Sequence, residues 1–129
     1  MTKSNTTTKA SITAIGGYVP EDRLTNKDLE LLVDTNDDWI QSRTGIRERR
    51  ILKDPKKATS FLAIQASKNL IKKNNIDPST IDMVIVATTT PDMQIAATAA
   101  YVASEIGSKN AFGYDLQAAC SGFLYAMSM

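Results

Sequence analysis

Cys120 is the only cysteine in the chain, and it lies in the run Asp115–Phe123, where an apolar segment gives way to small residues. The neighbours Ala119, Ser121 and Gly122 leave room for a substrate carbonyl, and backbone N–H groups at such a turn can bind a developing oxyanion. A helix N-terminus also stabilises the thiolate of a nearby cysteine. The pattern therefore predicts a nucleophile at a turn from a strand into a helix.

A lone cysteine has a second interpretation, as a small buried hydrophobic residue without a chemical role. The chain has no histidine, which excludes a Cys-His or Ser-His pair within it and argues against zinc and iron. We therefore expect no metal ion. If Cys120 is a nucleophile, the groups that move protons for it lie outside these 129 residues.

The composition is that of one ordinary soluble domain, since 43% of the 129 residues are hydrophobic and 22% are charged. A formal net charge of +1 gives no electrostatic reason for a nucleic-acid partner. No apolar segment is long enough to span a bilayer, and no secretory signal follows the polar N-terminus. We expect a cytoplasmic protein without a membrane partner, with a flexible extension at 1–10 and one domain at 11–129.

Strand and helix patterns alternate along this domain. An apolar residue at every fourth position predicts a helix over 59–74. Capping-box patterns at Thr25 and Thr35 predict two short helices, the second over 37–44. The strand over 83–87 is continuously apolar, so we expect it to be buried on both faces. The other expected elements are strands at 11–15, 46–52 and 111–116, and helices at 96–106 and from Ser121.

The order of these elements indicates an α/β fold with parallel strands. Ligands bind at the C-terminal ends of the strands in such sheets, and both Cys120 and the loop 88–94 fall at such ends. The last helix has only about two turns before Met129 and no capping residue. We therefore expect this sequence to be a truncated form of a longer chain.

Three blocks carry a resemblance to a known family: Asp34–Arg50 (DTNDDWIQSRTGIRERR), Val84–Asp92 (VIVATTTPD) and Asp115–Phe123 (DLQAACSGF). In their residues, order and spacing they resemble β-ketoacyl-(acyl carrier protein) synthase III, a condensing enzyme of the thiolase-like superfamily. The resemblance covers residues 11–129. It implies an incomplete N-terminal half of a thiolase-like fold, with a sheet flanked by helices.

The resemblance also implies an activity for Cys120 in the initiation of fatty acid biosynthesis. In this family the cysteine takes an acyl group from acetyl-CoA or another short acyl-CoA. Malonyl on acyl carrier protein then loses carbon dioxide and attacks the thioester, so that covalent capture divides one difficult step into two. The family's histidine and asparagine belong to segments that this sequence lacks, and Asn110 matches neither. No cofactor is implied, because CoA thioester and carrier protein are substrates.

Trp39 and Arg43 match the family's nucleotide-binding residues. The resemblance implies that Trp39 stacks on the CoA adenine and that Arg43, four residues along the same helix face, belongs to the same site. An aromatic ring suits a purine and a guanidinium suits phosphate. Thr35 corresponds to a further residue that lines this site. Without the resemblance, a tryptophan on a short helix is more often part of a core.

Ile95 stands where family members often place an aromatic residue at the wall of the acyl pocket, contributed across a dimer. Isoleucine is smaller, so the size of the accepted primer can differ. The strand over 111–116 resembles the one that pairs with its twin in the family's homodimer. The resemblance therefore implies that the complete protein is a homodimer.

Three arginines, Arg47, Arg49 and Arg50, have two interpretations. They can form a patch for the acidic carrier protein. Their alternation around Glu48 equally suits an ordinary solvated strand at an edge.

Two hypotheses of different class remain open. The first is the condensing enzyme, with this chain holding only part of the site. The second is a non-catalytic remnant of a split or decayed gene, which at most binds CoA or a complementary fragment. A chalcone-synthase-like or hydroxymethylglutaryl-CoA-synthase-like enzyme would share the cysteine turn, but the block around Trp39 argues against it. In either case we expect the 129 residues alone to lack condensing activity.

Overall fold

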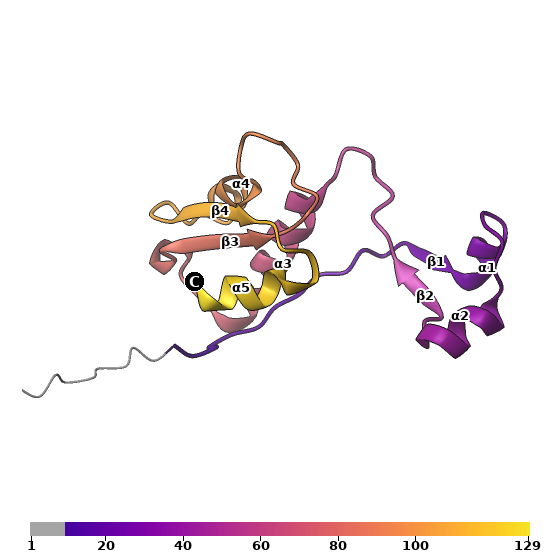
Figure 1. Ribbon diagram of the computed structural model, residues 1–129. Coiled ribbons are helices and arrows are strands. Elements are labelled where there is room, and N and C mark those ends of the chain that lie inside the picture. Colours follow the sequence, from indigo (N-terminus) through magenta and orange to yellow (C-terminus); the bar gives the residue numbers. More distant parts are fainter. Residues whose placement is uncertain (1–9) are drawn as a thin grey trace, which may run out of the picture.

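The computed structural model describes residues 10–129. The flexible extension expected at 1–10 therefore lies, except for Ala10, outside the described residues. Figure 1 shows two parts joined by extended segments: a sheet with helices on both faces, and a smaller part with two short strands and two short helices. Within residues 10–129, no helix is both long and apolar enough to cross a membrane.

The larger part is built on two parallel strands, β3 (Met83–Ala87) and β4 (Phe112–Leu116). Their register pairs Met83 with Phe112 and Ala87 with Leu116. Parallel pairing brings the C-terminal ends of both strands to the same edge. The loop after β3 and the turn after β4 therefore leave the sheet together, as the sequence predicted.

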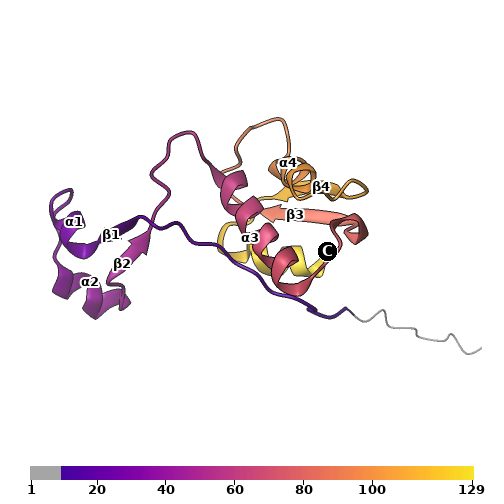
Figure 2. The ribbon, with the colours of Figure 1, turned by 180° about the vertical axis from the view of Figure 1, so that it is seen from behind.

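Helices cover the two faces of this sheet. The helices α3 (Thr59–Asn74) and α4 (Thr98–Glu105) lie on one face, and α5 (Gly122–Ser128) lies on the other (Figures 1 and 2). Single-turn 3₁₀ helices, η1 (Pro78–Thr80) and η2 (Ala119–Ser121), precede β3 and α5. The core lies between α3, α4 and β3. Its buried residues are Ile64, Val86, Ala99, Val102 and Ile106.

The expectation that β3 is buried on both faces is wrong. Only Val86 is buried, and Met83 remains 38% exposed. Val84 and Val86 lie on the face that packs against the core, while Met83, Ile85 and Ala87 alternate onto the other face. Among the described residues, the helix that contacts this second face is the short α5, which leaves part of the face exposed.

The smaller part contains a short antiparallel ribbon and two helices. The strands β1 (Arg23–Thr25) and β2 (Glu48–Arg50) pair antiparallel. Between them come α1 (Asn26–Glu30) and α2 (Asp37–Thr44). The predicted strand over 46–52 is confirmed in its central three residues.

The predicted helix starts are confirmed in part. Thr25 caps α1 with a reciprocal capping box, in which the Asp28 carboxylate accepts from the Thr25 amide at 2.8 Å. The second cap is Asn36 and not Thr35, because Asn36 Oδ1 accepts from the Trp39 amide at 2.8 Å. The helix α2 ends at Gly45 with φ of 71°, a conformation that glycine adopts without strain.

The strand expected over 11–15 is wrong, since residues 10–20 contain no regular element. Alternation alone does not make a strand, because a strand also needs a neighbour for its backbone hydrogen bonds. Instead the segment passes along α3, where Gly16 approaches Leu70 and the Gly17 amide lies 3.5 Å from Asn69 Oδ1. The Tyr18 ring meets the Phe61 ring edge to face at 5.8 Å.

Candidate functional site

Cys120 lies in the turn η2, between the end of β4 and the start of α5. Its thiol is free and exposed, so the interpretation as a buried hydrophobic residue does not hold. Gly122 packs this turn against β3, because a Cβ added there would lie 3.2 Å from Ala87 Cβ. The predicted order of strand, turn and helix around Cys120 is confirmed.

The backbone of this turn is unusual immediately before the cysteine. Ala119 has φ of 43°, in the left-handed region where a Cβ clashes with the backbone. A residue with a side chain pays a conformational cost there unless its surroundings hold it. This geometry could not be predicted from the residue type, because position 119 holds alanine and not the glycine that usually marks a left-handed residue.

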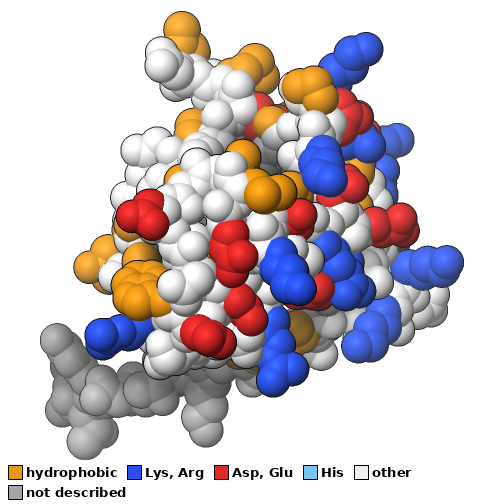
Figure 3. Space-filling model, turned by 90° about the vertical axis from the view of Figure 1, so that its right-hand side faces the viewer, with side chains coloured by type: hydrophobic (Ala, Val, Ile, Leu, Met, Phe, Trp, Pro, Cys, Tyr) orange, Lys and Arg blue, Asp and Glu red, His pale blue; other side chains and the backbone are white. Residues whose placement is uncertain are grey.

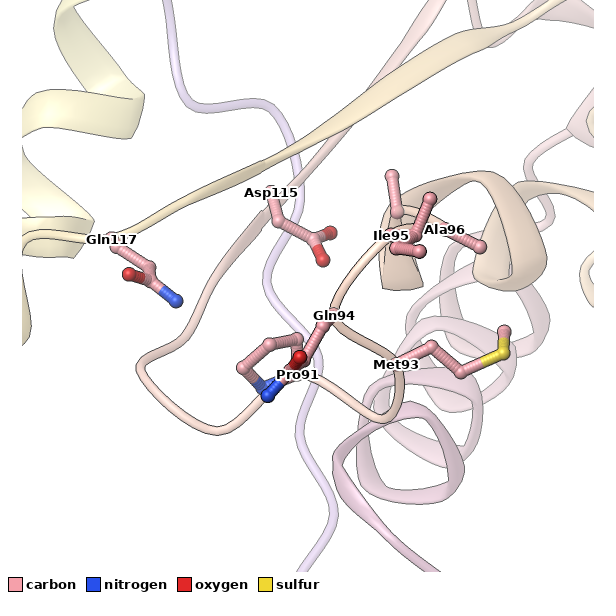
Figure 4. Close-up of a pocket in the computed structure, with 8 residues that line it drawn as sticks. Pro91, Met93, Gln94, Ile95, Ala96, Asp115 and Gln117 are labelled. Atoms are coloured by element: carbon pink, nitrogen blue, oxygen red, sulfur yellow. The ribbon is translucent and has the colours of Figure 1, made fainter.

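A cavity of about 410 Å³ lies at the C-terminal edge of the sheet, beside this turn (Figure 4). It lies between the loop that leads into α4 and the end of β4. In Figure 4, Asp115 projects from β4, and Gln117 from the residue that follows the strand, towards that loop. Ile95 lines the cavity and is fully exposed. The residues that line it are Pro91, Met93, Gln94, Ile95, Ala96, Ala97, Asp115 and Gln117.

Asp115 and Gln117 were not singled out as site residues from the sequence. Asp115 receives hydrogen bonds from the backbone amides of Thr98 and Ala99, each at 2.8 Å. Gln117 lies three residues before Cys120 and shares the cavity with Ile95. The available signal was position: both residues belong to the block that contains Cys120, and alternation along a strand places them on one face.

Hydrogen bonds join the loop after β3 to the first residues of α3 and α4. Thr59 Oγ1 donates to Thr90 O at 2.6 Å, and the Ser60 amide donates to Asp92 Oδ1 at 2.8 Å. The Asp92 amide in turn donates to Thr98 Oγ1 at 3.3 Å. The starts of α3 and α4 therefore hold the segment that presents Ile95.

The candidate CoA residues lie in the smaller part of the chain. Thr35 and Trp39 line a second hollow of about 190 Å³ with Asp34 and Asn36. Trp39 is 56% exposed, so its ring is available to a ligand and is not core. Arg43 is exposed one turn further along α2.

A buried polar residue holds α2 in place. Asn26 is 2% exposed, and its Nδ2 donates to Asp37 Oδ1 at 2.6 Å and to Ile46 O at 2.8 Å. Its Oδ1 accepts from Arg49 Nη1 at 2.7 Å. The hydrogen bonds from Asn26 and then Gln41 hold the pKa of the Asp37 carboxyl below its ordinary value of 3.8. One side chain thereby joins α1, α2 and the ribbon.

Two of the three arginines considered as a carrier-protein patch make hydrogen bonds within the fold. Arg49 binds Asn26, and Arg50 Nη1 donates to Pro20 O at 2.8 Å. Glu48 pairs with Arg23 at 2.8 Å. On the face shown in Figure 3, Lys and Arg side chains are interspersed with Asp and Glu. These contacts favour the interpretation as an ordinary strand edge.

The structure brings some of the predicted site residues together and leaves others apart. Ile95 lies with Gln117 at the edge where the Cys120 turn leaves the sheet. Thr35, Trp39 and Arg43 belong to the other part of the chain, and Cys120 lines neither of the two hollows described above. Among residues 10–129, no group of three or more His, Cys, Asp or Glu side chains is placed to hold a metal ion.

A parallel sheet between helices, with an exposed cysteine at the turn into a following helix, defines this chain as part of a thiolase-like α/β protein. No family model matches it. Curated proteins do: a β-ketoacyl-[acyl-carrier-protein] synthase III of Chlorobium chlorochromatii is 57% identical over 120 residues, 93% of this chain and 36% of the relative. Its counterpart in Porphyromonas gingivalis is 52% identical over the same shares of both chains.

Solved structures agree with this assignment. The β-ketoacyl-[acyl carrier protein] synthase III of Thermus thermophilus superposes with a TM-score of 0.86 at 44% identity, over 92% of this chain and 36% of that one. The chain thus spans about a third of the length of the relatives that it matches. Over the part that it spans, the chain is similar to the N-terminal third of β-ketoacyl-[acyl-carrier-protein] synthase III.

Proposed function

We propose that this chain supplies the nucleophile and part of the CoA site of a condensing acyltransferase that initiates fatty acid biosynthesis. The observation that carries the proposal is the exposed thiol of Cys120, at the turn where both parallel strands end. The names of the relatives support the reaction class. In this proposal residues 11–129 act as one N-terminal thiolase-like domain.

The reaction proceeds in two steps at one sulfur atom. The Cys120 thiolate attacks the acyl-CoA carbonyl, a new C–S bond forms, and CoA leaves as a thiol after taking up a proton. Malonyl-acyl carrier protein then loses carbon dioxide, and the resulting carbanion attacks the acyl carbon. The C–S bond to Cys120 breaks, and the product is a 3-oxoacyl-acyl carrier protein. The small residues around Cys120 give the acyl group access to the sulfur.

The CoA nucleotide binds on α2. The Trp39 ring stacks on adenine, Arg43 binds phosphate, and Thr35 lines the same hollow. At the other end of the substrate, Ile95 lies on the wall of the acyl pocket, in the cavity that Gln117 shares. Since Ile95 is fully exposed here, a complete pocket needs further groups to enclose it.

The partners follow from the same assignment. Acyl-CoA and malonyl-acyl carrier protein are the substrates, neither metal nor cofactor takes part, and the protein works in the cytoplasm. It works as a homodimer, because β4 pairs only with β3 among the described residues and offers its other edge to a second copy. Neither nucleic acid nor a membrane is a partner in this proposal.

These 129 residues do not complete the condensation alone in our proposal. They contain no histidine, and the carbanion step needs donors beside the sulfur. One observation favours the second hypothesis, a non-catalytic remnant: the α5 side chains Phe123, Leu124 and Tyr125 are 68%, 67% and 55% exposed. A surface of this kind makes an isolated chain prone to aggregate.

Intact-mass spectrometry with acetyl-CoA tests the proposal. The protein is the full-length form, or a chimera in which these residues replace the matching third of the Chlorobium chlorochromatii relative. We expect an acetyl adduct on the wild type and on Ser121→Ala, and none on Cys120→Ser. An unmodified wild type, or an adduct that survives in Cys120→Ser, would reject the assignment of Cys120 as the nucleophile. If the 129-residue chain by itself catalysed the condensation, the proposal that it needs further groups would be rejected.

A binding measurement, which does not depend on catalysis, tests the proposed nucleotide site. Trp39 is the only tryptophan among these 129 residues, and subtracting the signal of Trp39→Phe isolates its fluorescence in the full-length protein or chimera. We expect CoA to quench this fluorescence, and Arg43→Ala to weaken the binding about tenfold through the loss of a charged hydrogen bond. Arg47→Ala, a nearby exposed arginine, is the matched control and should bind CoA as the wild type does. Quenching unaffected by Arg43→Ala would remove Arg43 from the site.

A further inference from the structure

The start of α4 has no cap of its own. Its N-cap residue is Ala97, whose side chain accepts no hydrogen bond, and the first turn contains no acidic residue. The first amides of a helix need acceptors, because the helix itself supplies none. The acceptors here come from another element: Asp115 Oδ2 and Oδ1 bind the amides of Thr98 and Ala99, each at 2.8 Å.

A glycine on β4 allows the contact between Asp115 and the start of α4. Gly113 and Asp115 lie two residues apart on β4 and so point to the same face. A Cβ at Gly113 would lie 3.1 Å from the Ala99 carbonyl carbon and Cβ, tighter than ordinary contact. The absence of that side chain lets α4 approach the strand closely enough for both carboxylate oxygens to reach it.

This contact ties together two segments of the proposed site. Asp115 is five residues before Cys120 on the segment that forms the turn, while Thr98 follows the loop that carries Ile95. Figure 4 shows the Asp115 carboxylate pointing from β4 towards that loop. The distance between the acyl-pocket wall and the cysteine turn therefore depends on this carboxylate.

We propose that Asp115 is a positioning residue: its carboxylate holds the start of α4 against β4 and thereby fixes the wall of the acyl pocket, which sets the size of the accepted primer. The inference deepens the proposed function and rests on it. Asp115 acts through Thr98, Ala99 and the loop before them, and it does not touch the reacting atoms in this account.

Asp115→Asn tests the role with little change in shape. An amide group has one acceptor oxygen in place of two, so one of the two helix amides loses its partner. A wall held less tightly admits a longer acyl chain more readily, so we expect the ratio of kcat/KM for acetyl-CoA to that for butyryl-CoA to fall, by about tenfold, the usual scale of discrimination by pocket size. Asp115→Glu, which keeps the carboxylate, should recover part of the ratio. Asp82→Asn, an exposed carboxylate next to β3, should leave it unchanged.

A double variant separates positioning from simple helix stability. Ala97 has extended backbone angles, φ −64° and ψ 126°, so Ala97→Ser can cap α4 locally. Ala97 lines the same cavity, so the single variant Ala97→Ser is the reference for the double variant. In Ala97→Ser/Asp115→Asn we expect the melting temperature to approach that of Ala97→Ser, while the primer ratio stays shifted relative to Ala97→Ser. A primer ratio that recovers with the melting temperature would overturn the positioning role.

Hydrogen exchange provides a readout that does not depend on catalysis. The Thr98 and Ala99 amides should exchange about tenfold faster in Asp115→Asn than in Asp82→Asn, since they lose a charged acceptor. Unchanged exchange would show that Asp115 does not hold α4. A wild-type protein that takes no acyl group would instead reject the proposed function and the selectivity role, while the exchange result still decides whether Asp115 fixes the helix.

Discussion

The side chain of Asn26 donates a hydrogen bond of 2.6 Å to Asp37 and so joins the first residue of α1 to the first residue of α2. Asn26 also binds Ile46 O and Arg49. Replacing it by alanine removes one hydrogen-bond partner from each of Asp37, Ile46 O and Arg49 and empties a buried position, so Asn26→Ala should lower the free energy of unfolding by about 2–3 kcal/mol. Urea unfolding followed by Trp39 fluorescence measures the change.

The matched control is Asn110, an exposed residue whose side chain makes one long contact, 3.4 Å to Ser79 O. Asn110→Ala should change the free energy of unfolding by no more than about 0.5 kcal/mol. Equal urea midpoints for Asn26→Ala and Asn110→Ala would show that Asn26 does not hold α2.

The same contact predicts a pH dependence. Hydrogen bonds from Asn26 and Gln41 lower the pKa of Asp37 in the folded chain, so the folded state binds fewer protons than the unfolded state near that pH. Asp37 therefore stabilises the fold above its unfolded pKa of about 4. This contribution disappears as the pH falls from there through the lowered folded pKa.

We expect the stability difference between wild type and Asp37→Asn to be larger at pH 7 than at pH 3, measured by urea unfolding at each pH. The effect should shrink in an Asn26→Ala background, because the hydrogen bond from Asn26 is the largest cause of the lowered pKa. A difference that is the same at both pH values would count against this account.

Local patterns were sufficient to predict the elements that position Cys120. The apolar row on α3, the apolar runs of β3 and β4, and the small residues after Leu116 are all signals within a few neighbours. They located α3 at Thr59–Asn74 and placed the turn at the C-terminal edge of the sheet. The capping pattern also predicted α2, and the family blocks added the candidate CoA residues on it.

The contacts that hold the site together could not be predicted in this way. Asp115 binds amides 16 and 17 residues away, and Asn26 binds groups 11 to 23 residues away. Nothing in the local sequence indicates which partner a buried polar side chain will meet. The incorrect prediction of a strand over 11–15 has the same cause. The alternation of apolar and polar residues does not show whether a neighbouring strand is present to pair with the segment.

Two adjacent glycines test how residues 10–20 pack. A Cβ at Gly16 would lie 2.6 Å from Leu70 Cα and 2.7 Å from Leu70 N, whereas a Cβ at Gly17 meets nothing within 4 Å. Because the obstacle is helix backbone, Gly16→Ala should cost about 1–3 kcal/mol of stability. Gly17→Ala should cost no more than about 0.5 kcal/mol. Thermal unfolding of the pair decides the matter, and identical melting temperatures would mean that the segment does not lie on α3 in solution.

The turn before the nucleophile supplies the last prediction. Ala119 has a positive φ of 43°, while Ala118 has a negative φ of −149°. Glycine at position 119 relieves the left-handed strain, whereas glycine at position 118 only adds freedom to the unfolded chain. Ala119→Gly should therefore be more stable than Ala118→Gly by about 1–2 kcal/mol in urea unfolding. Iodoacetamide should alkylate Cys120 in both variants, as expected of an exposed thiol. If Ala118→Gly were the more stable of the two, residue 119 would not hold a left-handed conformation in the folded protein.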